Sequence, residues 1–289
     1  MKPPHFDYVA PTTVDEMLTI LAASPETTTL LAGGQSLVPL LNMRLAQPEL
    51  VVDLNRVSGL DLIEERDGQM RIGPMVRQRT LETNDSVGER LPLLVEATRH
   101  IAHLAIRSRG TVGGSLSHAD PAAELPAVVL ALRARMIVRQ VSGDERSVPA
   151  GEFFLGPLTT AVQPGEFLSR IDVSIPGDGT GWAFLEVTRT HGAFALVGAA
   201  ALVGLGPNRR IETADLALCG VGATPYAPTW LNDVLVGESA DNSAFDAVAV
   251  RVAAEIEPQD DVHVTSDYRR HVAGVLVKRS LRLAASRAG

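Results

Sequence analysis

The chain has 289 residues, about twice the length of a typical single domain, so we expect two or three packed units. Its 26 Lys and Arg against 34 Asp and Glu give a net charge of −8, which repels phosphate backbones and argues against a nucleic-acid partner. A single cysteine, Cys219, excludes an internal disulfide and a thiolate-held cluster, and it indicates a reducing compartment, with a cytoplasmic location as the default.

Local patterns in the first half of the chain predict a mixture of helices and strands. Thr13 and Glu16 stand at the spacing of a capping box before an apolar stripe, which predicts a helix over 14–23. Asp120-Pro121 has the form of an N-cap followed by a first-turn proline, so a helix is expected over 121–132. Further expectations are strands over 28–31 and 50–54, a turn at Asp67-Gly68, and a helix over 92–103 that carries His100 and His103.

The second half predicts strands followed by helices. The expected elements are strands over 135–141, 167–175, 182–187 and 196–205, then helices over 243–256 and 267–286. Breaker residues concentrate over 176–181, which predicts a domain boundary near 177. The longest apolar stretch, 193–206, is too short to cross a bilayer, and no membrane insertion is expected. Helices and strands alternate without a regular order, so the predicted class is α+β.

Two glycine-rich segments resemble each other. They are Ala32-Gly33-Gly34-Gln35-Ser36-Leu37 and Val112-Gly113-Gly114-Ser115-Leu116, and in each a Gly pair is followed closely by Ser-Leu. Glycines let backbone N–H groups line a concave surface, and serine adds a hydroxyl, so two such loops could hold a diphosphate from both sides. An ordinary turn at a strand end is the alternative for either loop. The sequence has no G-x-x-x-x-G-K-[ST] motif, and the dinucleotide-like segment 220–225 lacks its third glycine.

These loops and their surroundings carry a family resemblance. Residues 32–39, followed by Val52-Asp53-Leu54, resemble the first FAD loop of the medium, flavin-binding subunit of the molybdenum hydroxylases, the family of xanthine and aerobic carbon monoxide dehydrogenases. Residues 109–115 with 118–126 resemble the second FAD loop. Further similar segments are 153–156 with Glu166 and Ile171, 189–195, and 267–269 with Lys278 and Arg279, so the resemblance runs from Phe6 to near Leu281.

The resemblance implies the fold and the domain organisation. It implies two α+β subdomains that enclose FAD, similar to the vanillyl-alcohol oxidase (PCMH) type, and a small C-terminal α+β domain with antiparallel strands. Residues 1–57 and 58–176 are expected to form the two halves of the FAD fold, and 177–289 the C-terminal domain.

The resemblance also implies the cofactor contacts. The pyrophosphate would be held, mostly through backbone N–H groups, by Ala32, Gly33, Gly34, Gln35 and Ser36 of the first loop and by Thr111, Val112, Gly113 and Gly114 of the second. Leu37 and Ser115 are also expected to bind the cofactor. Oriented backbone amides set the local electrostatic potential there, so the net charge of −8 is no obstacle to binding the negatively charged pyrophosphate.

Three further residues have two interpretations each. Glu124 matches an acidic residue that bonds a sugar hydroxyl of the cofactor, and the alternative is a solvated acid in the first turn of a helix. Phe194 matches an aromatic residue near the flavin ring, and the alternative is a core phenylalanine. Ala193, directly before it, stands where many relatives carry an acidic residue, so there is no basis for a proton-handling role at this position. His118 is flavin-proximal or a packed loop histidine, and with Asp120 it lacks the further ligands that a metal site needs.

The family role implied is electron relay. A large partner with a molybdopterin cofactor hydroxylates the substrate, electrons pass through two [2Fe-2S] clusters of a small partner, and FAD in this chain delivers them to a final acceptor. We expect a dimer of heterotrimers, and the lone Cys219 agrees with clusters held elsewhere. The alternatives are a stand-alone flavin oxidase or reductase and an assembly module without FAD. The substrate and the acceptor are left open.

Overall fold

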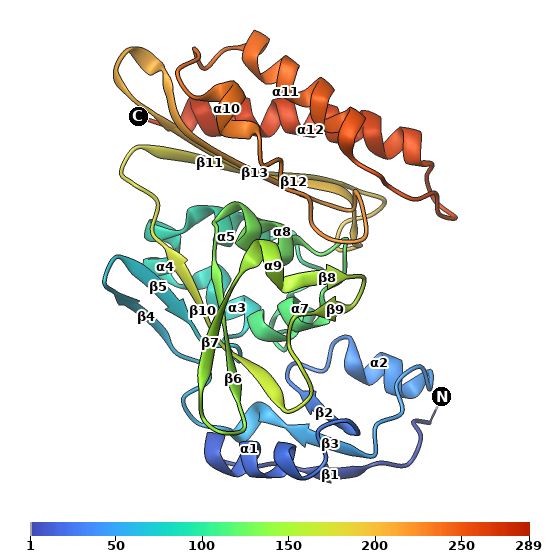
Figure 1. Ribbon diagram of the computed structural model, residues 1–289. Coiled ribbons are helices and arrows are strands. Elements are labelled where there is room, and N and C mark those ends of the chain that lie inside the picture. Colours follow the sequence, from blue (N-terminus) through green and yellow to red (C-terminus); the bar gives the residue numbers. More distant parts are fainter. Residues whose placement is uncertain (1) are drawn as a thin grey trace.

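The computed structural model describes residues 2–289 and shows three units stacked on one another, from the first part of the chain at one end to the last at the other (Figure 1). Each unit contains its own sheet, and a fourth, two-stranded sheet lies at the side of the middle unit. The mixed α+β class expected from the sequence is confirmed.

The first unit is a three-stranded parallel sheet of order β1-β3-β2. Its elements are β1 (Asp7–Val9), α1 (Val14–Ala23), β2 (Thr28–Leu31), α2 (Leu37–Asn42), β3 (Leu50–Asp53) and the short 3₁₀ helix η1 (Leu54–Arg56). Helix α1 begins after the predicted cap, where Thr13 Oγ1 accepts from the backbone N–H of Glu16 at 3.2 Å. The core is small, and Met75 and Phe167 of the middle unit complete it around Met17 and Val52.

The middle unit is built on a five-stranded antiparallel sheet of order β4-β5-β10-β6-β7. The strands are β4 (Ile63–Arg66), β5 (Gln69–Ile72), β6 (Arg135–Gln140), β7 (Glu145–Pro149) and β10 (Glu166–Ser174), with the hairpin β8 (Phe154–Gly156) and β9 (Thr159–Thr160) beside them. The helices are α3 (Gln78–Thr83), α4 (Asp85–Arg90), α5 (Pro92–Thr98), α6 (Leu104–Arg107), α7 (Val112–His118), α8 (Glu124–Ala131) and α9 (Ala150–Phe153). The last strand in sequence, β10, lies in the centre of the sheet, so the unit closes only when residue 174 is reached.

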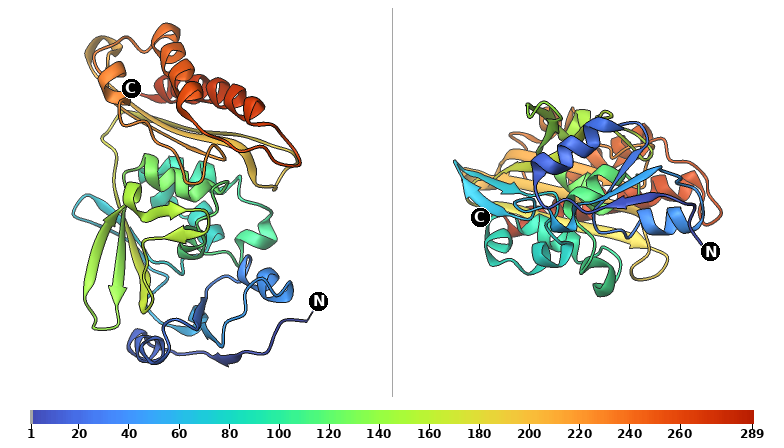
Figure 2. Two further views of the ribbon diagram at one scale, coloured as in Figure 1. Left: turned by 45° about the vertical axis from the view of Figure 1, so that its right-hand side comes forward. Right: turned by 90° about the horizontal axis from the view of Figure 1, so that it is seen from below.

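The third unit is an antiparallel meander covered by helices on its outer face, as Figure 2 shows from two further sides. It comprises β11 (Thr180–Thr188), β12 (Ala195–Leu205), η2 (Pro207–Arg209), β13 (Ile211–Cys219), α10 (Leu231–Leu235), α11 (Asn242–Glu255) and α12 (Ser266–Arg287). Alternate residues of β12 divide between two cores: Val197 and Val203 pack toward α11 and α12, whereas Ala200 and Leu202 pack toward the middle unit.

The middle and third units are joined by polar contacts as well as by the shared core. Arg287 Nη1 donates to Glu96 Oε2 at 2.6 Å, and Arg133 Nε donates to Asp215 Oδ1 at 2.5 Å. The backbone N–H of Gly220 donates to the carbonyl of Pro121 at 2.8 Å. The third unit is therefore attached to the middle one at α5 and near both ends of α8.

Two helix predictions need correction. The helix expected over 121–132 is α8, which starts only at Glu124 with Ala123 as N-cap, while Asp120 Oδ1 accepts from Ala122 N–H in a separate turn. Pro126 is the reason, because a proline deeper inside a helix would clash with the preceding turn, whereas in the first turn it is tolerated. The helix expected over 92–103 ends at Thr98, since Ala102 adopts a φ of 42°. His100 and His103 therefore lie outside it.

The second glycine segment is helical. Residues Val112–His118 form α7, with Thr111 as N-cap, where the sequence had indicated a loop. The glycines allow close packing: a Cβ at Gly113 would lie 2.4 Å from Pro74 Cβ. The helix is thus pressed against the segment that follows β5.

Candidate functional site

The first glycine segment forms an open turn between β2 and α2. Gly34 adopts a φ of 72°, which favours glycine, and Gln35 Nε2 donates to the carbonyl of Gly33 at 2.9 Å. Within residues 2–289, the backbone N–H groups of Gly33, Gly34, Gln35 and Ser36 have no protein acceptor. All four residues are only half-buried, and Ser36 makes no capping bond with its hydroxyl. This turn therefore offers four consecutive amide donors to a ligand.

The amides of the second segment are used inside the protein. Val112 N–H donates to Val76 O at 2.9 Å, Gly113 N–H to Pro74 O at 2.8 Å, and Gly114 N–H to Thr111 Oγ1 at 3.0 Å. Ser115 N–H donates to Thr111 O at 3.1 Å. The amide donors still available in the two segments therefore belong to the first one, and the second presents its surface and side chains.

The two segments meet directly. A Cβ at Gly33 would lie 2.4 Å from the carbonyl oxygen of Arg109 and 2.8 Å from Gly110 Cα. A Cβ at Gly114 would lie 3.4 Å from Ala32 Cβ. The structure thus brings the two loops together at Ala32, Gly33 and Gly114, from two units of the fold, because glycine leaves room for backbone to touch backbone.

Two residues that sequence analysis missed hold the segments together. Asn55 Nδ2 donates to the carbonyl of Ala32 at 2.9 Å, and Arg77 Nη2 donates to Asn55 Oδ1 at 2.5 Å. Arg77 Nη1 also donates to the carbonyl of Arg109. Asp53 anchors Asn55 by accepting from its N–H at 2.9 Å, and Tyr8 Oη–H donates to Asp53 Oδ2 at 2.6 Å. No sequence motif marks Asn55 or Arg77; the nearest signal was Asp53 in the matched segment 52–54.

Glu124 lies at the first position of α8 and is buried, with 3% of its surface exposed. Its solvated alternative is therefore wrong. Burial raises the pKa of its carboxyl from 4.5 to about 7, and the negative charge of Glu186 on β11 acts in the same direction. Glu124 thus sits where the second segment meets the third unit.

Phe194 is exposed at 56% of its surface, so the core alternative for this residue is wrong. It ends the loop between β11 and β12. That loop rests on the middle unit: a Cβ at Gly192 would lie 2.6 Å from His103 Cε1, and the His103 and His191 rings are 5.8 Å apart. The loop thus contacts His103, which directly precedes α6. Helix α6 in turn leads to Arg109-Gly110, the segment against which Gly33 packs.

His118 and Cys219 have structural surroundings. His118 is the last residue of α7 and is half-buried, next to Ala119 in the left-handed conformation at φ 52°. Cys219 is fully buried, and burial raises the pKa of its thiol well above the usual range. Within residues 2–289, no three metal-ligating side chains come together, and no helix has the length and apolar character to cross a bilayer.

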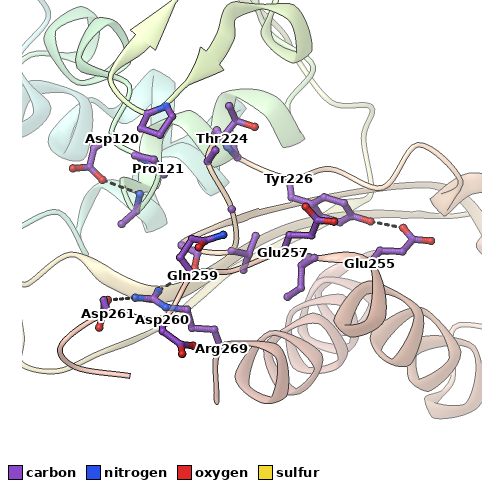
Figure 3. A pocket seen from close by; sticks show the side chains of 18 residues that line it. Asp120, Pro121, Thr224, Tyr226, Glu255, Glu257, Gln259, Asp260, Asp261 and Arg269 are labelled. Atoms are coloured by element: carbon purple, nitrogen blue, oxygen red, sulfur yellow. Dashed lines mark hydrogen bonds and ion pairs between the residues drawn. The ribbon is translucent and has the colours of Figure 1, made fainter. Parts of the chain in front are cut away.

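A cavity of about 570 Å³ opens between the middle and third units (Figure 3). Carboxylates dominate its wall, including Asp120, Glu257 and Asp260, whereas Arg269 is engaged with Asp261 and the carbonyl of Gly220. This charge disfavours a phosphate ligand. The cavity includes no residue of the two glycine segments, so we place the cofactor site at those segments and not here.

The residues at the glycine segments fit the diphosphate of FAD. Four free amides in one turn supply donors, and the β-carbon-free Gly33 and Gly114 let the two backbones approach. These segments therefore suit an anion that is held by backbone N–H groups, as the family resemblance implied.

Comparisons with known proteins cover nearly the whole chain. Residues 4–176 match the FAD binding domain in molybdopterin dehydrogenase, and residues 182–284 match the CO dehydrogenase flavoprotein C-terminal domain. The chain is 39% identical to the caffeine dehydrogenase subunit beta of Pseudomonas sp. (strain CBB1), over 99% of this chain and 97% of that protein.

Solved structures agree in fold. A chain of carbon monoxide dehydrogenase from Hydrogenophaga pseudoflava superposes with a TM-score of 0.96 at 35% identity, covering all of both chains. A chain of quinoline 2-oxidoreductase from Pseudomonas putida 86 superposes with a TM-score of 0.94 at 37% identity, covering 99% of each.

Proposed function

Because this chain belongs to the family of FAD-binding medium subunits of molybdenum hydroxylases, such as carbon monoxide dehydrogenase, we propose that it relays electrons from the [2Fe-2S] clusters of a small partner to an external acceptor. It is an oxidoreductase flavoprotein subunit of a molybdopterin-dependent complex. The observation that best supports this location of the cofactor is the turn of four free backbone amides, which packs against the second glycine segment.

FAD, when bound, supplies reversible electron transfer, since a flavin accepts and releases electrons singly or in pairs. The chain supplies the holding groups. In this proposal the amides of Gly33, Gly34, Gln35 and Ser36 donate to the diphosphate, and Ser115 with Thr111 lines the opposite side. Glu124 contacts a polar oxygen of the sugar alcohol or ring, and His118 and Phe194 lie near the flavin.

Partner composition extends the proposal. The complex would contain a small subunit with two [2Fe-2S] clusters and a large molybdopterin subunit, assembled as a dimer of heterotrimers in the cytoplasm. Cys219 is the chain's one cysteine, so the clusters need another chain. The names of the relatives mention caffeine, carbon monoxide and quinoline, and this variety in similar chains supports a substrate site in a partner.

The same division of the chain is proposed at the domain level, with FAD subdomains over 1–57 and 58–176 and a C-terminal domain over 177–289. The first sheet ends with β3 and η1 before residue 57, and the five-stranded sheet begins at Ile63. The two family models meet between residues 176 and 182, which supports the second border.

Titration of the isolated chain with FAD tests the site. We expect one FAD per chain, bound without a covalent link, and no comparable binding of FMN, because the diphosphate is the part that the loops hold. Gly114→Asp should abolish binding, since a carboxylate would be forced beside the diphosphate and its Cβ would lie 2.7 Å from Thr111 Oγ1.

Gly156→Asp is the matched control. A Cβ at Gly156 meets nothing within 4 Å, so the same added charge should leave both the fold and the affinity for FAD unchanged. FAD bound by a folded Gly114→Asp variant, or FMN bound as tightly as FAD by the wild-type chain, would contradict this site.

A further inference from the structure

A group of titratable side chains is buried where α8 meets the sheet of the third unit. Glu124 is 3% exposed, and the side chain of Glu186 on β11 is 7% exposed. Neither carboxyl forms an ion pair with a lysine or arginine anywhere in residues 2–289. An unpaired buried carboxylate is unfavourable, so at least one member of such a group takes up a proton.

The sheet packs these side chains close together. Glu186, Gly198 and Cys219 lie opposite one another across β11, β12 and β13, so their side-chain positions share the face that packs on α8. A Cβ at Gly198 would lie 2.7 Å from Cys219 Sγ and 3.6 Å from Glu186 Cβ. The absent side chain of Gly198 therefore gives Cys219 Sγ room to pack over β12 beside Glu186.

His100 forms a hydrogen bond with one of the two carboxyls. Its Nδ1 lies 3.1 Å from Glu186 Oε1, and its ring packs on Phe184 with centroids 5.3 Å apart. The bond to Glu186 raises the pKa of His100. Glu186 Oε2 is buried and has no partner within residues 2–289.

The groups that act on Glu124 come from four segments. Burial is the largest influence and raises its pKa, and the charges of Glu186 and Asp120 raise it further. A hydrogen bond from the backbone N–H of Glu124 itself lowers this pKa, and so does the charge of His100, on which Glu96 of α5 acts. Cys219 on β13 is held as a neutral thiol by its own burial. The acids therefore outweigh the one cation at this position.

We propose that Glu124 keeps its proton up to about neutral pH, because it is buried without a Lys or Arg partner and is influenced by the acid Glu186, and that in this neutral form it offers a proton donor to an oxygen of the bound cofactor. His100 and Glu186 are positioning residues in this arrangement. A neutral acid adds no negative charge beside a dianionic diphosphate, which an ionised Glu124 would. The inference rests on the proposed function, because that function places Glu124 at FAD.

Infrared titration of the cofactor-free chain tests the protonation state directly. We expect a carboxylic acid C=O band that disappears with a midpoint near pH 7 in the wild type and is absent from Glu124→Gln, which assigns it. In Glu186→Gln, which keeps the shape and the bond to His100, the midpoint should fall by up to about one pH unit, because a like charge has been removed. Glu64→Gln, at an exposed position on β4, should leave the midpoint unchanged.

Two results would overturn the inference: no band lost in Glu124→Gln, or an unchanged midpoint in folded Glu186→Gln. If Glu186→Gln does not fold, Glu186→Ala provides the same reading. FAD titration of the same proteins separates the two proposals. Glu124→Gln should still bind FAD, without the pH dependence near 7, whereas failure of the wild-type chain to bind FAD at any pH would contradict the site and leave the infrared result standing.

Discussion

Gly33 shows how one absent β-carbon organises this site. Its backbone approaches Arg109 so closely that a Cβ there would lie 2.4 Å from a carbonyl oxygen. Its φ is in the range open to any residue, since only Gly34 of this pair adopts a positive φ. The two glycines are thus required for different reasons: Gly33 for close approach and Gly34 for conformation.

Cys219 is expected to be a packing residue. Cys219→Ser should lower the free energy of unfolding by about 1–3 kcal/mol, because a hydroxyl replaces a sulfur in a fully buried position. FAD stoichiometry and flavin reduction in the complex should not change. Denaturant unfolding and flavin spectra measure the two effects.

Ala217→Ser is the control for that prediction, since Ala217 is equally buried on the same face of β13. A similar loss of stability in both variants would assign the effect to the buried hydroxyl. Loss of flavin reduction in a stable Cys219→Ser variant would instead assign the thiol a redox role.

At the scale of elements, Arg77 and Asn55 add hydrogen bonds to the direct packing between the turn before α2 and the segment that leads into α7. Arg77→Met removes two hydrogen bonds from a charged donor and leaves their acceptors unpaired, which costs about 1–3 kcal/mol. The affinity for FAD should therefore fall about tenfold or more, as measured by equilibrium titration of the isolated chain.

Arg66→Met serves as the comparison, because Arg66 pairs only with the neighbouring Asp67 and its side chain is 65% exposed. Its affinity for FAD should match the wild type. Equal affinities in all three proteins would show that the two segments keep their geometry without Arg77.

The elements also show what sequence could and could not predict. The strands over 135–141 and 196–205 and the helix over 267–286 were predicted to within a residue or two, since their apolar repeats are long. Short helices such as α7 were missed because Gly113 and Gly114 have low helix propensity, and tertiary packing on Pro74 decides the conformation. Pro126 could have placed the start of α8 correctly.

Prediction of the site from the sequence was limited in the same way. The glycine loops were visible because they are local in sequence, whereas Asn55, Arg77 and Glu186 act on residues far along the chain and no local motif reveals them. The family resemblance supplied the cofactor, and the free amides showed which loop donates.

At the scale of the whole molecule, this chain should act only within its complex. Co-expressed with its small and large partners, its flavin should be reduced when substrate is added. The purified chain alone should show no reduction by the same substrate, because the proposal places the substrate site in another subunit. Absorbance of the flavin is the measurement, and chemical reduction of the lone chain with dithionite is the control that its flavin is competent.

Equal reduction by substrate in the lone chain and in the complex would mean that this polypeptide has its own substrate site. The stand-alone oxidase or reductase would then be the right description, with the interdomain cavity of about 570 Å³ as the first place to look.

The small core of the first unit links cofactor supply to the lifetime of the subunit. Eight buried residues form that core, and three of them, Leu60, Met75 and Phe167, belong to the middle unit. A ligand that grips both glycine segments stabilises this attachment by about 2.7 kcal/mol when present at a hundred times its dissociation constant. A chain synthesised while flavin is scarce would therefore expose its N-terminal region to cellular proteases, and turnover would remove subunits that cannot carry electrons.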